Sequence, residues 1–430
     1  MSLFPAPNSD SAFRSFFSSK ARDKFLSNAQ ELIRQGFSQN KFAIRLKTDF
    51  TDVLLLSPRY LPQLRTEDRL QGGPYTVQEL LGYLPGFEPF RFADQMPKFI
   101  PDVILTRMNR YLSNVPASIT EEVEVNLAEN WTDEKVAVVT AVQALRKWPR
   151  ALVSIVHWFH PKAKAARALL NEARAMIQPM HEQRKRDMAA GKPVPADTLT
   201  WFEEVAKGQA YDAAVVQLTM ALAGLHSSTD LLCAVMLNLS EHPDVVEPLR
   251  QELVQVLKRE GWKQTTFSQL TLMDSVLKES QRLKPVGRAF FKRVAVDNIK
   301  LDHGVEIPKG AFVAVSNHGM WDPHNYTDPD KFDAYRFARM SDNKSSAFST
   351  VSVEHTGFGF GKNSCPGRNY VALQLKIILA HLLLKYEWKL PDNYTPATFN
   401  NGFDLIADPF AQVLVRRRLE APEVSLRQNT

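Results

Sequence analysis

The sequence predicts a mainly α-helical fold with a minor β-sheet, organised as a single large domain. Most apolar residues recur at helical spacing, and the longest helical segment, 211–240, is too broadly apolar for a surface helix. Segments that alternate between apolar and polar residues, as strands do, are few and short. The chain holds 2 cysteines in 430 residues, which excludes a disulfide framework and a four-thiolate zinc site. The fold must therefore depend on helix packing.

The composition restricts the class of protein further. Hydrophobic residues make up 44% and charged residues 23%, which is typical of globular domains and argues against a disordered or polytopic membrane protein. The net charge of +6 is small for a chain of this length, so no nucleic-acid partner is predicted. Residues 1–20 contain no apolar run long enough for a signal peptide or a membrane span.

The elements are expected in a fixed order along the chain. The N-terminal half has a helix at 11–39, two strands at 42–46 and 53–56, a proline-rich loop with exposed aromatic residues at 74–89, and helical segments at 102–130. The C-terminal half has the core helix at 211–240, helices at 244–260 and 270–283, strands at 294–299 and 311–316, and a last helix that ends near 386.

One loop, from Phe358 to Arg368, carries the most informative chemistry. Glycines on both sides of Cys365 let the backbone approach a planar ligand, while the thiol points from a helix N-terminus. The helix dipole and the amides of the turn lower the pKa of a thiol in this position, which suits a metal-bound thiolate. A buried structural cysteine is the alternative. A phosphate-binding loop is excluded, because it needs Gly at Thr356 and Ser or Thr at Asn363.

The same loop matches the pattern Phe-x-x-Gly-x-x-x-Cys-x-Gly-Arg, and the chain therefore resembles the cytochrome P450 family. The resemblance implies haem b with Cys365 as the iron ligand. It also implies a haem-dependent monooxygenase that uses O2 to oxidise an apolar small molecule. Further sequence details resemble fungal secondary-metabolism members that oxidise terpenoids, of the ent-kaurene oxidase-like type. The residues that the resemblance places around the cofactor in this loop are Phe358, Gly361, Gly367 and Arg368.

Three charged residues outside the loop resemble the structural network of the family. Glu279 and Arg282 lie three residues apart on one helix face, a spacing that alone is common on protein surfaces. With Arg336 they match the Glu/Arg/Arg network that supports the haem side of the core. Arg293 matches the position from which family members reach a haem propionate, with a solvated strand residue as the alternative. Asn363 stands where relatives often have Arg or His.

The middle of the long core helix resembles the oxygen-activation motif of the family. Residues 223–227 read Ala-Gly-Leu-His-Ser, and the resemblance implies that Ser227 and His226 manage proton delivery, with His226 replacing the usual acid. The alternative is a hydroxyl that bonds back to the helix backbone one turn earlier. Phe290, Phe291 and the turn around Phe403 are expected to face an apolar substrate, although core packing would explain them as well.

The resemblance also predicts the organisation of the chain. A helical lead-in without a membrane anchor occupies 1–40, the monooxygenase domain 41–420, and a tail 421–430. Several tens of residues are expected to be missing after Trp131, near 131–146, compared with the family.

The chain carries no flavin or nicotinamide fingerprint, so the resemblance implies electrons from a separate NADPH-dependent flavoprotein reductase. A basic face with Lys362 and Arg368 is expected to dock this acidic partner. The family implies the endoplasmic reticulum membrane as the location, or the cytoplasm if the anchor is truly missing. Two other functions remain open. One is a family member that binds haem or a ligand without turnover, and the other is a haem-thiolate isomerase or dehydratase that needs no external electrons.

Overall fold

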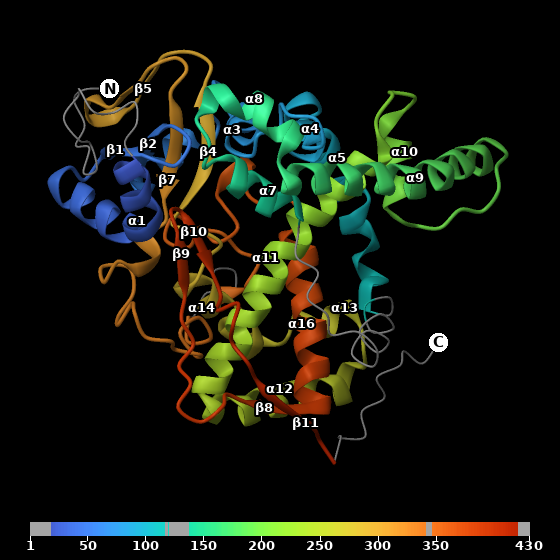
Figure 1. Cartoon of the computed structure of the whole chain (residues 1–430). Helices are drawn as coiled ribbons and strands as arrows, with labels where there is room; N and C mark the ends of the chain where they lie inside the picture. Colours follow the sequence, from blue (N-terminus) through green and yellow to red (C-terminus); the bar gives the residue numbers. More distant parts are fainter. Residues whose placement is uncertain (1–18, 117–118, 120–136, 341–345, 420–430) are drawn as a thin grey trace.

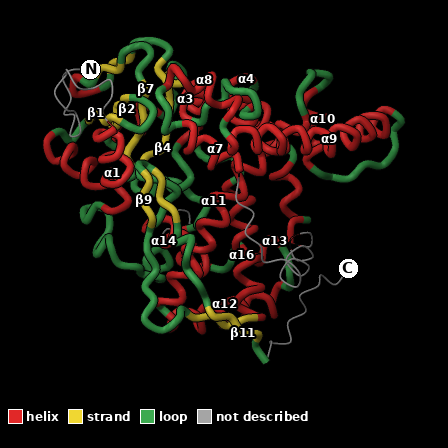
Figure 2. Tube along the Cα trace, viewed as in Figure 1, coloured by secondary structure: helices red, strands yellow, loops and turns green. Residues whose placement is uncertain are grey.

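The computed structural model describes residues 19–116, 119, 137–340 and 346–419. Helices account for most of these residues, and the strands form one larger sheet and three two-stranded sheets, as Figure 2 shows. Helix α1 (Ser19–Gln39) and the larger sheet lie on one side of the molecule, while α11 (Ala213–Glu241) and α16 (Arg368–Lys385) pack together at its centre (Figure 1). The prediction of a mainly helical single domain with a minor sheet is confirmed.

The other elements follow in chain order. The helices are α2 (Leu61–Leu64), α3 (Gly72–Glu79), α4 (Glu88–Gln95), α5 (Phe99–Thr106), α7 (Ala137–Leu145), α8 (Arg150–Phe159), α9 (Pro161–Ala189), α10 (Thr198–Ala206), α12 (Val246–Glu260), α13 (Gln264–Phe267) and α14 (Thr271–Leu283). The strands are β1 (Ala43–Lys47), β2 (Asp52–Leu56), β3 (Leu70–Gln71), β4 (Ala289–Ala295), β5 (Ile299–Lys300), β6 (Glu306–Ile307), β7 (Phe312–Ser316), β8 (Tyr386–Lys389), β9 (Phe399–Asn401), β10 (Asp404–Ile406) and β11 (Leu414–Arg417).

The larger sheet has the strand order β1-β2-β7-β4-β3, and its β2–β7 pair is parallel while the other pairs are antiparallel. Its strands are apolar on both faces because both faces are covered. Val53 and Leu55 pack with Phe25 of α1 on one face, whereas Leu54 and Leu56 pack with residues of α2 on the other. This period of two residues is the geometry of a strand whose side chains alternate between two cores.

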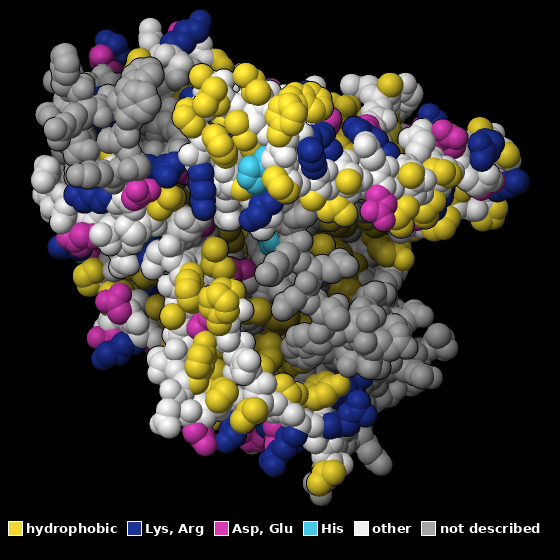
Figure 3. Space-filling view, viewed as in Figure 1, with side chains coloured by type: hydrophobic (Ala, Val, Ile, Leu, Met, Phe, Trp, Pro, Cys, Tyr) yellow, Lys and Arg dark blue, Asp and Glu magenta, His cyan; other side chains and the backbone are white. Residues whose placement is uncertain are grey.

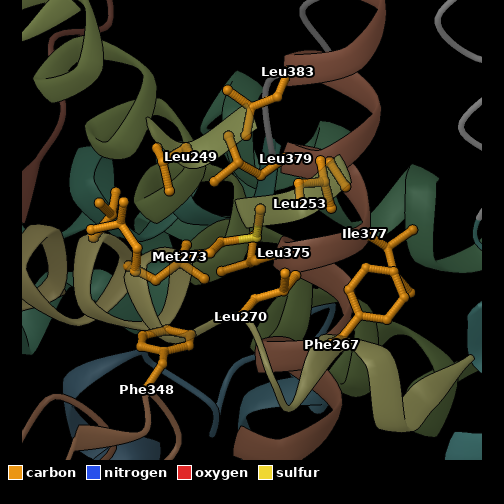
Figure 4. Packing of buried hydrophobic residues seen from close by; sticks show 14 of the residues in the cluster. Leu249, Leu253, Phe267, Leu270, Met273, Phe348, Leu375, Ile377, Leu379 and Leu383 are labelled. Carbon is orange, nitrogen blue, oxygen red and sulfur yellow. The ribbon is translucent and has the colours of Figure 1, made fainter. Parts of the chain in front are cut away.

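The largest core surrounds the C-terminal half of α11, where it meets α12, α14 and α16. Figure 4 shows Leu249 and Leu253 of α12 directed toward Leu375 and Leu379 of α16, with Met273 of α14 filling the space beside them. All five side chains are buried, so this cluster fixes α16 relative to α12 and α14.

The proline-rich segment at 74–89 is not the loop that the sequence predicts, because it contributes to both α3 and α4. Pro74 and Pro89 lie in the first turns of these helices, where the missing N–H has no helical partner in any case. The aromatic residues there were expected to be exposed, but Phe87 and Phe90 are buried. The helical segments expected at 102–130 correspond to the end of α5 at Thr106 and to a 3-10 helix at Met108–Ser113, while 117–118 and 120–130 lie outside the described residues.

Candidate active site

The loop before α16 holds Cys365 in a tight turn. The Cys365 N–H donates to the Phe358 carbonyl at 2.7 Å, which closes the loop on itself. Gly359 has a φ of +81°, and a Cβ on it would lie 3.0 Å from the Asn363 carbonyl oxygen. A side chain at this position would therefore face both a left-handed backbone and a close backbone contact. Gly361 also has a positive φ, of 62°.

The Cys365 thiol is half-buried at the N-terminal end of α16. Burial raises the pKa of Cys365, although the backbone N–H groups of Gly367 and Arg368 and the Arg368 charge favour the thiolate. The sequence predicts a lowered pKa, and this is wrong for the protein without a metal because desolvation outweighs the donors. Coordination to a metal cation deprotonates a thiol outright. Arg368 also donates to the Cys365 carbonyl at 3.0 Å, so its guanidinium is part of the loop.

Arg293 provides the test of whether the site fits a haem. This guanidinium donates to the Lys292 carbonyl at 2.8 Å and to Asn363 Oδ1 at 3.1 Å, and burial lowers the pKa of Arg293. Among the described residues, no carboxylate forms an ion pair with it. A largely buried cation whose hydrogen-bond partners are neutral oxygens fits an anionic group such as a haem propionate. Its position beside the cysteine loop agrees with that fit.

The middle of α11 is the second part of the site. Both ends of this apolar helix are buried, yet Leu225 is 62% exposed and His226 is also exposed. A Cβ on Gly224 would have no neighbour within 4 Å. The helix middle therefore borders open space, and the molecule is hollowed between its upper helices and its lower body, with hydrophobic side chains along the hollow (Figure 3). Such a surface suits an apolar ligand.

The polar groups of this helix differ in their bonding. The Ser227 hydroxyl donates to the Ala223 carbonyl at 3.2 Å. This is the hydrogen bond to the preceding helix turn that was the alternative to a role in proton delivery. The hydroxyl oxygen can still accept a hydrogen bond while its proton is engaged. Ser228 is buried, and its hydroxyl has no partner among the described residues. The structure thus places Ser227 and His226 together on the accessible stretch of α11.

The Glu279, Arg282 and Arg336 side chains form one buried network. Arg282 makes a two-pronged pair with Glu279, at 2.8 Å from Nε to Oε2 and 2.9 Å from Nη2 to Oε1. Arg336 Nε donates to both Glu279 oxygens, at 3.0 and 3.1 Å. Arg282 also donates to the carbonyls of Met320 and Pro329, each at 2.7 Å. The network ties α14 to the chain segments that follow β7, which is a structural function.

Asp230, which no motif in the sequence marks, joins α11 to two other segments. Its carboxylate accepts from the Ala407 N–H at 2.8 Å and pairs with Lys284 at the end of α14. Burial lowers the pKa of Lys284 to about 8. The available signal was the position of Asp230, four residues after His226 and hence one turn along the same helix face.

The aromatic residues that were expected to face the substrate differ in how deeply they are buried. Phe403 is wrong as a substrate-facing residue, because it is buried and its ring lies 4.9 Å from that of Phe25 in the core beneath α1. Phe290 is half-buried at a β-bulge of β4. Phe291 is also wrong as a substrate-facing residue, because its side chain is buried in the core beside α2.

These features define a haem-thiolate type of protein. They are a mainly helical fold, a cysteine in a glycine-containing loop, and an arginine beside this loop that has no carboxylate partner among the described residues. The family model described as Cytochrome P450 matches residues 97–411. The chain belongs to the cytochrome P450 family.

Comparison with individual proteins agrees with this family. The chain is 90% identical to dideacetyl fusicoccin A C-19 hydroxylase from Phomopsis amygdali, in an alignment that covers 100% of the chain and 91% of that protein. It is 40% identical to fusicocca-1,10(14)-diene-8beta,16-diol C-9 hydroxylase from the same organism, over 94% of the chain and 89% of that protein. Among solved structures, the haem domain of cytochrome P450DA matches with a TM-score of 0.66 and 17% identity, over 96% of the chain and 97% of that domain.

The first alignment also shows a difference in length. It runs over 472 positions, whereas the chain has 430 residues, so 42 positions of the alignment have no residue of this chain. The sequence predicts missing residues near 131–146, a region that lies partly outside the described residues. The position of the gap stays a prediction.

The family and the relatives establish the general activity. The protein is a haem b-dependent monooxygenase, an oxidoreductase of fungal secondary metabolism that acts on a small molecule. When bound, the haem iron activates O2 for insertion into the substrate. Monooxygenases of this family take electrons from redox partners. The alternatives without turnover or without external electrons are not favoured, because the most similar relatives named above are hydroxylases.

Proposed function

We propose that this protein hydroxylates dideacetyl fusicoccin A at C-19, or a diterpenoid closely similar to it. The single observation that supports this substrate is the 90% identity to a hydroxylase of that name across the whole chain. An exposed stretch in the middle of the apolar helix α11 is compatible with a large apolar skeleton.

In this proposal the site residues have distinct roles. Cys365 ligates the iron, and Phe358, Gly361, Gly367 and Arg368 shape the loop beneath the cofactor. Arg293 holds a propionate through its guanidinium. Ser227 accepts and passes a proton at its Oγ, His226 exchanges protons with solvent, and the Glu279, Arg282 and Arg336 network keeps the loop side of the core rigid.

The test uses the haem-loaded protein with dideacetyl fusicoccin A, NADPH and a flavoprotein reductase under 18O2. We expect a C-19 alcohol that carries one labelled oxygen atom. The matched variants are Cys365→Ala and Cys233→Ala, since Cys233 is the other cysteine of the chain and lies on α11. Cys365→Ala should lose both the product and the strongly red-shifted Soret band of the reduced, carbon monoxide-bound protein. Retention of that band in Cys365→Ala would contradict the assignment of the ligand.

We also propose that the electron donor is an NADPH-dependent flavoprotein reductase that docks near Lys362. The Lys362 side chain is 42% exposed and pairs with the more exposed Asp68. Arg368 is a less direct docking residue, because it donates to the Cys365 carbonyl. Lys362→Glu should weaken reductase binding and flatten its salt dependence while leaving the haem spectrum unchanged. Unchanged affinity and salt dependence would contradict this docking face.

Finally, we propose that the enzyme works at the endoplasmic reticulum membrane surface. Helix α8 turns Val153 and His157 inward, whereas Ile155 is 60% and Phe159 72% exposed, together with Trp158. Residues 146–171 contain six Lys and Arg residues and no Asp or Glu. Hydrophobic side chains gather over α8 along the top of Figure 3, with basic side chains at their border. Aromatic groups bordered by cations are typical of helices that lie in a membrane interface.

Vesicle flotation tests this location. The haem-loaded protein should float with vesicles of phosphatidylcholine and phosphatidylserine, and a Trp158→Ser/Phe159→Ser variant should bind more weakly. Met176→Ser/Met180→Ser, on the exposed surface of α9, is the control. Equal flotation of both variants and the wild type would contradict a membrane role for α8.

A further inference from the structure

A cavity of about 430 Å³ lies between α1 and β9, and its wall includes Gln30 of α1 and Asn400 of β9. Helix α1 is kinked beside the cavity, since Asn28 has a non-helical φ of −130° and a ψ of 28°. Next to the kink, the Leu26 carbonyl accepts a hydrogen bond from the Gly402 N–H at 2.9 Å. The β9–β10 hairpin is therefore attached to α1 at the cavity (Figure 1).

The Arg288 guanidinium reaches the wall of this cavity from the segment before β4. Its Nη2 donates to Gln30 Oε1 at 2.9 Å and to Asn400 Oδ1 at 2.6 Å, and both acceptor residues line the cavity. Arg288 is 8% exposed, and its Nε has no hydrogen-bond partner among the described residues. Nε and Nη2 form the edge of a guanidinium that binds an oxyanion through two parallel hydrogen bonds, as Arg282 binds Glu279. In Arg288 this edge has no anion.

No carboxylate of the described chain offsets the Arg288 charge. Burial lowers the pKa of Arg288 to about 10, and its nearest polar contacts are two neutral amide oxygens. The Trp321 ring lies 5.6 Å from the guanidinium. Glu31 also lines the cavity, but its carboxylate pairs with Arg34 at 2.7 Å. Because neutral oxygens and a ring offset only part of the cost of desolvating a cation, a bound anion would stabilise this arrangement.

The anion that Arg288 lacks is not the haem propionate assigned to Arg293. Arg293 donates to Asn363 in the cysteine loop, whereas the side-chain acceptors of Arg288 belong to α1 and β9. The backbone of Arg288 is also fixed. Its N–H donates to the Phe403 carbonyl at 2.7 Å, and its carbonyl accepts from the Asn317 N–H at 2.8 Å. The guanidinium is therefore held at the cavity wall before a ligand arrives, which lowers the entropy cost of binding.

From these contacts we infer that the cavity between α1 and β9 binds the phosphate group of a small anionic molecule, with Arg288 as the cation that recognises it. The side-chain amides of Gln30 and Asn400 both face the guanidinium, and each can turn an NH2 group toward the same anion. Donors from three chain segments suit the several oxygens of a phosphate. The cavity is larger than a phosphate, so it also holds part of the molecule that carries this group. A phospholipid head group and a soluble phosphate ester present the same chemistry.

Isothermal titration of the haem-loaded protein with inorganic phosphate and with glycerol 3-phosphate tests the site. Arg288→Gln should weaken the binding of both at least tenfold, because a charge-assisted pair is lost. Gln30→Glu is the second variant. It keeps the side-chain shape and places a carboxylate beside Arg288 Nη2, so it should abolish phosphate binding and raise the urea midpoint. The matched control is Gln251→Glu, at an exposed glutamine of α12 that also precedes a glutamate. It should change neither property.

The outcomes decide both the site and the source of its ligand. Equal phosphate affinity in the wild type, Arg288→Gln and Gln30→Glu overturns the site, and so does a wild type that binds neither probe. A urea midpoint in Gln30→Glu that is no higher than in Gln251→Glu also overturns it, because Arg288 then lacks no anion. Dibutanoyl phosphatidic acid, a short-chain lipid, identifies the source. Tighter binding than that of glycerol 3-phosphate supports the site with a lipid head group as its ligand, and equal binding supports it with a soluble ester.

Discussion

Removal of the negative charge from Glu279 should destabilise the protein more than any equivalent surface change. Glu279→Gln preserves the shape of the side chain but leaves Arg282, which is 0% exposed, without its anion. Loss of one partner from a buried ion pair costs roughly 3–5 kcal/mol, because the remaining charge stays desolvated. Arg336 donates to the same carboxylate, so two cations lose their counter-ion at once. The expected loss of unfolding free energy is therefore at the upper end of that range.

Urea unfolding of the haem-loaded protein, followed by circular dichroism, measures this loss. Glu306→Gln is the matched control, because Glu306 pairs with Lys300 at 3.3 Å and both side chains are more than half exposed. That pair should contribute less than about 1 kcal/mol. A Glu279→Gln protein within about 1 kcal/mol of the control would refute the argument that Arg282 depends on Glu279 for its charge balance.

Three further predictions follow from the same structure. Burial lowers the pKa of His355 to about 3, below its ordinary value, so the unfolded chain binds more protons and stability should fall as the pH drops below about 6.5. The loss should reach roughly 2 kcal/mol at pH 5, and urea midpoints against pH should be flatter for His355→Gln. Gly359→Ala should lower haem affinity and stability by more than Gly208→Ala, since both positions have a positive φ but only Gly359 also meets a backbone oxygen; equal losses would contradict the close-contact argument. Arg293→Gln should weaken haem retention in a competition with apomyoglobin without changing the urea midpoint of the haem-free protein, whereas an unchanged haem off-rate would contradict a propionate contact.

The sequence predicted the elements whose apolar periodicity is strong. The expected core helix at 211–240 is α11 at Ala213–Glu241, and the expected helix at 270–283 is α14 at Thr271–Leu283. Both are long, and both bury a wide apolar surface, so tertiary contacts and local preference agree. The loop predicted from the prolines at 74–89 was wrong, because a residue that breaks a helix interior is well suited to a first helical turn.

The site was only partly predictable for a different reason. Cys365 and its glycines form a continuous motif, so their spacing is visible in the sequence. Asp230, Lys284 and Ala407 come from separate segments, and only the fold brings the end of α14 and the residue after β10 to α11. The direction of the Cys365 pKa was wrong for a similar reason, since the helix dipole can be read from sequence but desolvation depends on the neighbours.

The buried cations differ in whether a carboxylate of the protein pairs with them, and this difference distinguishes structural residues from a residue that contacts the cofactor. Arg282 is balanced by Glu279, Lys284 by Asp230, and Lys292 by Glu79. Among the described residues, Arg288 and Arg293 have no carboxylate partner, and burial lowers the pKa of both guanidinium groups. Arg288 stacks over Trp321 at 5.6 Å, and its Nη2 donates to the side-chain oxygens of Gln30 and Asn400 in the core, while its Nε has no partner among the described residues. Arg293 instead reaches one side-chain oxygen, on the cysteine loop, and so its missing anion points to the haem.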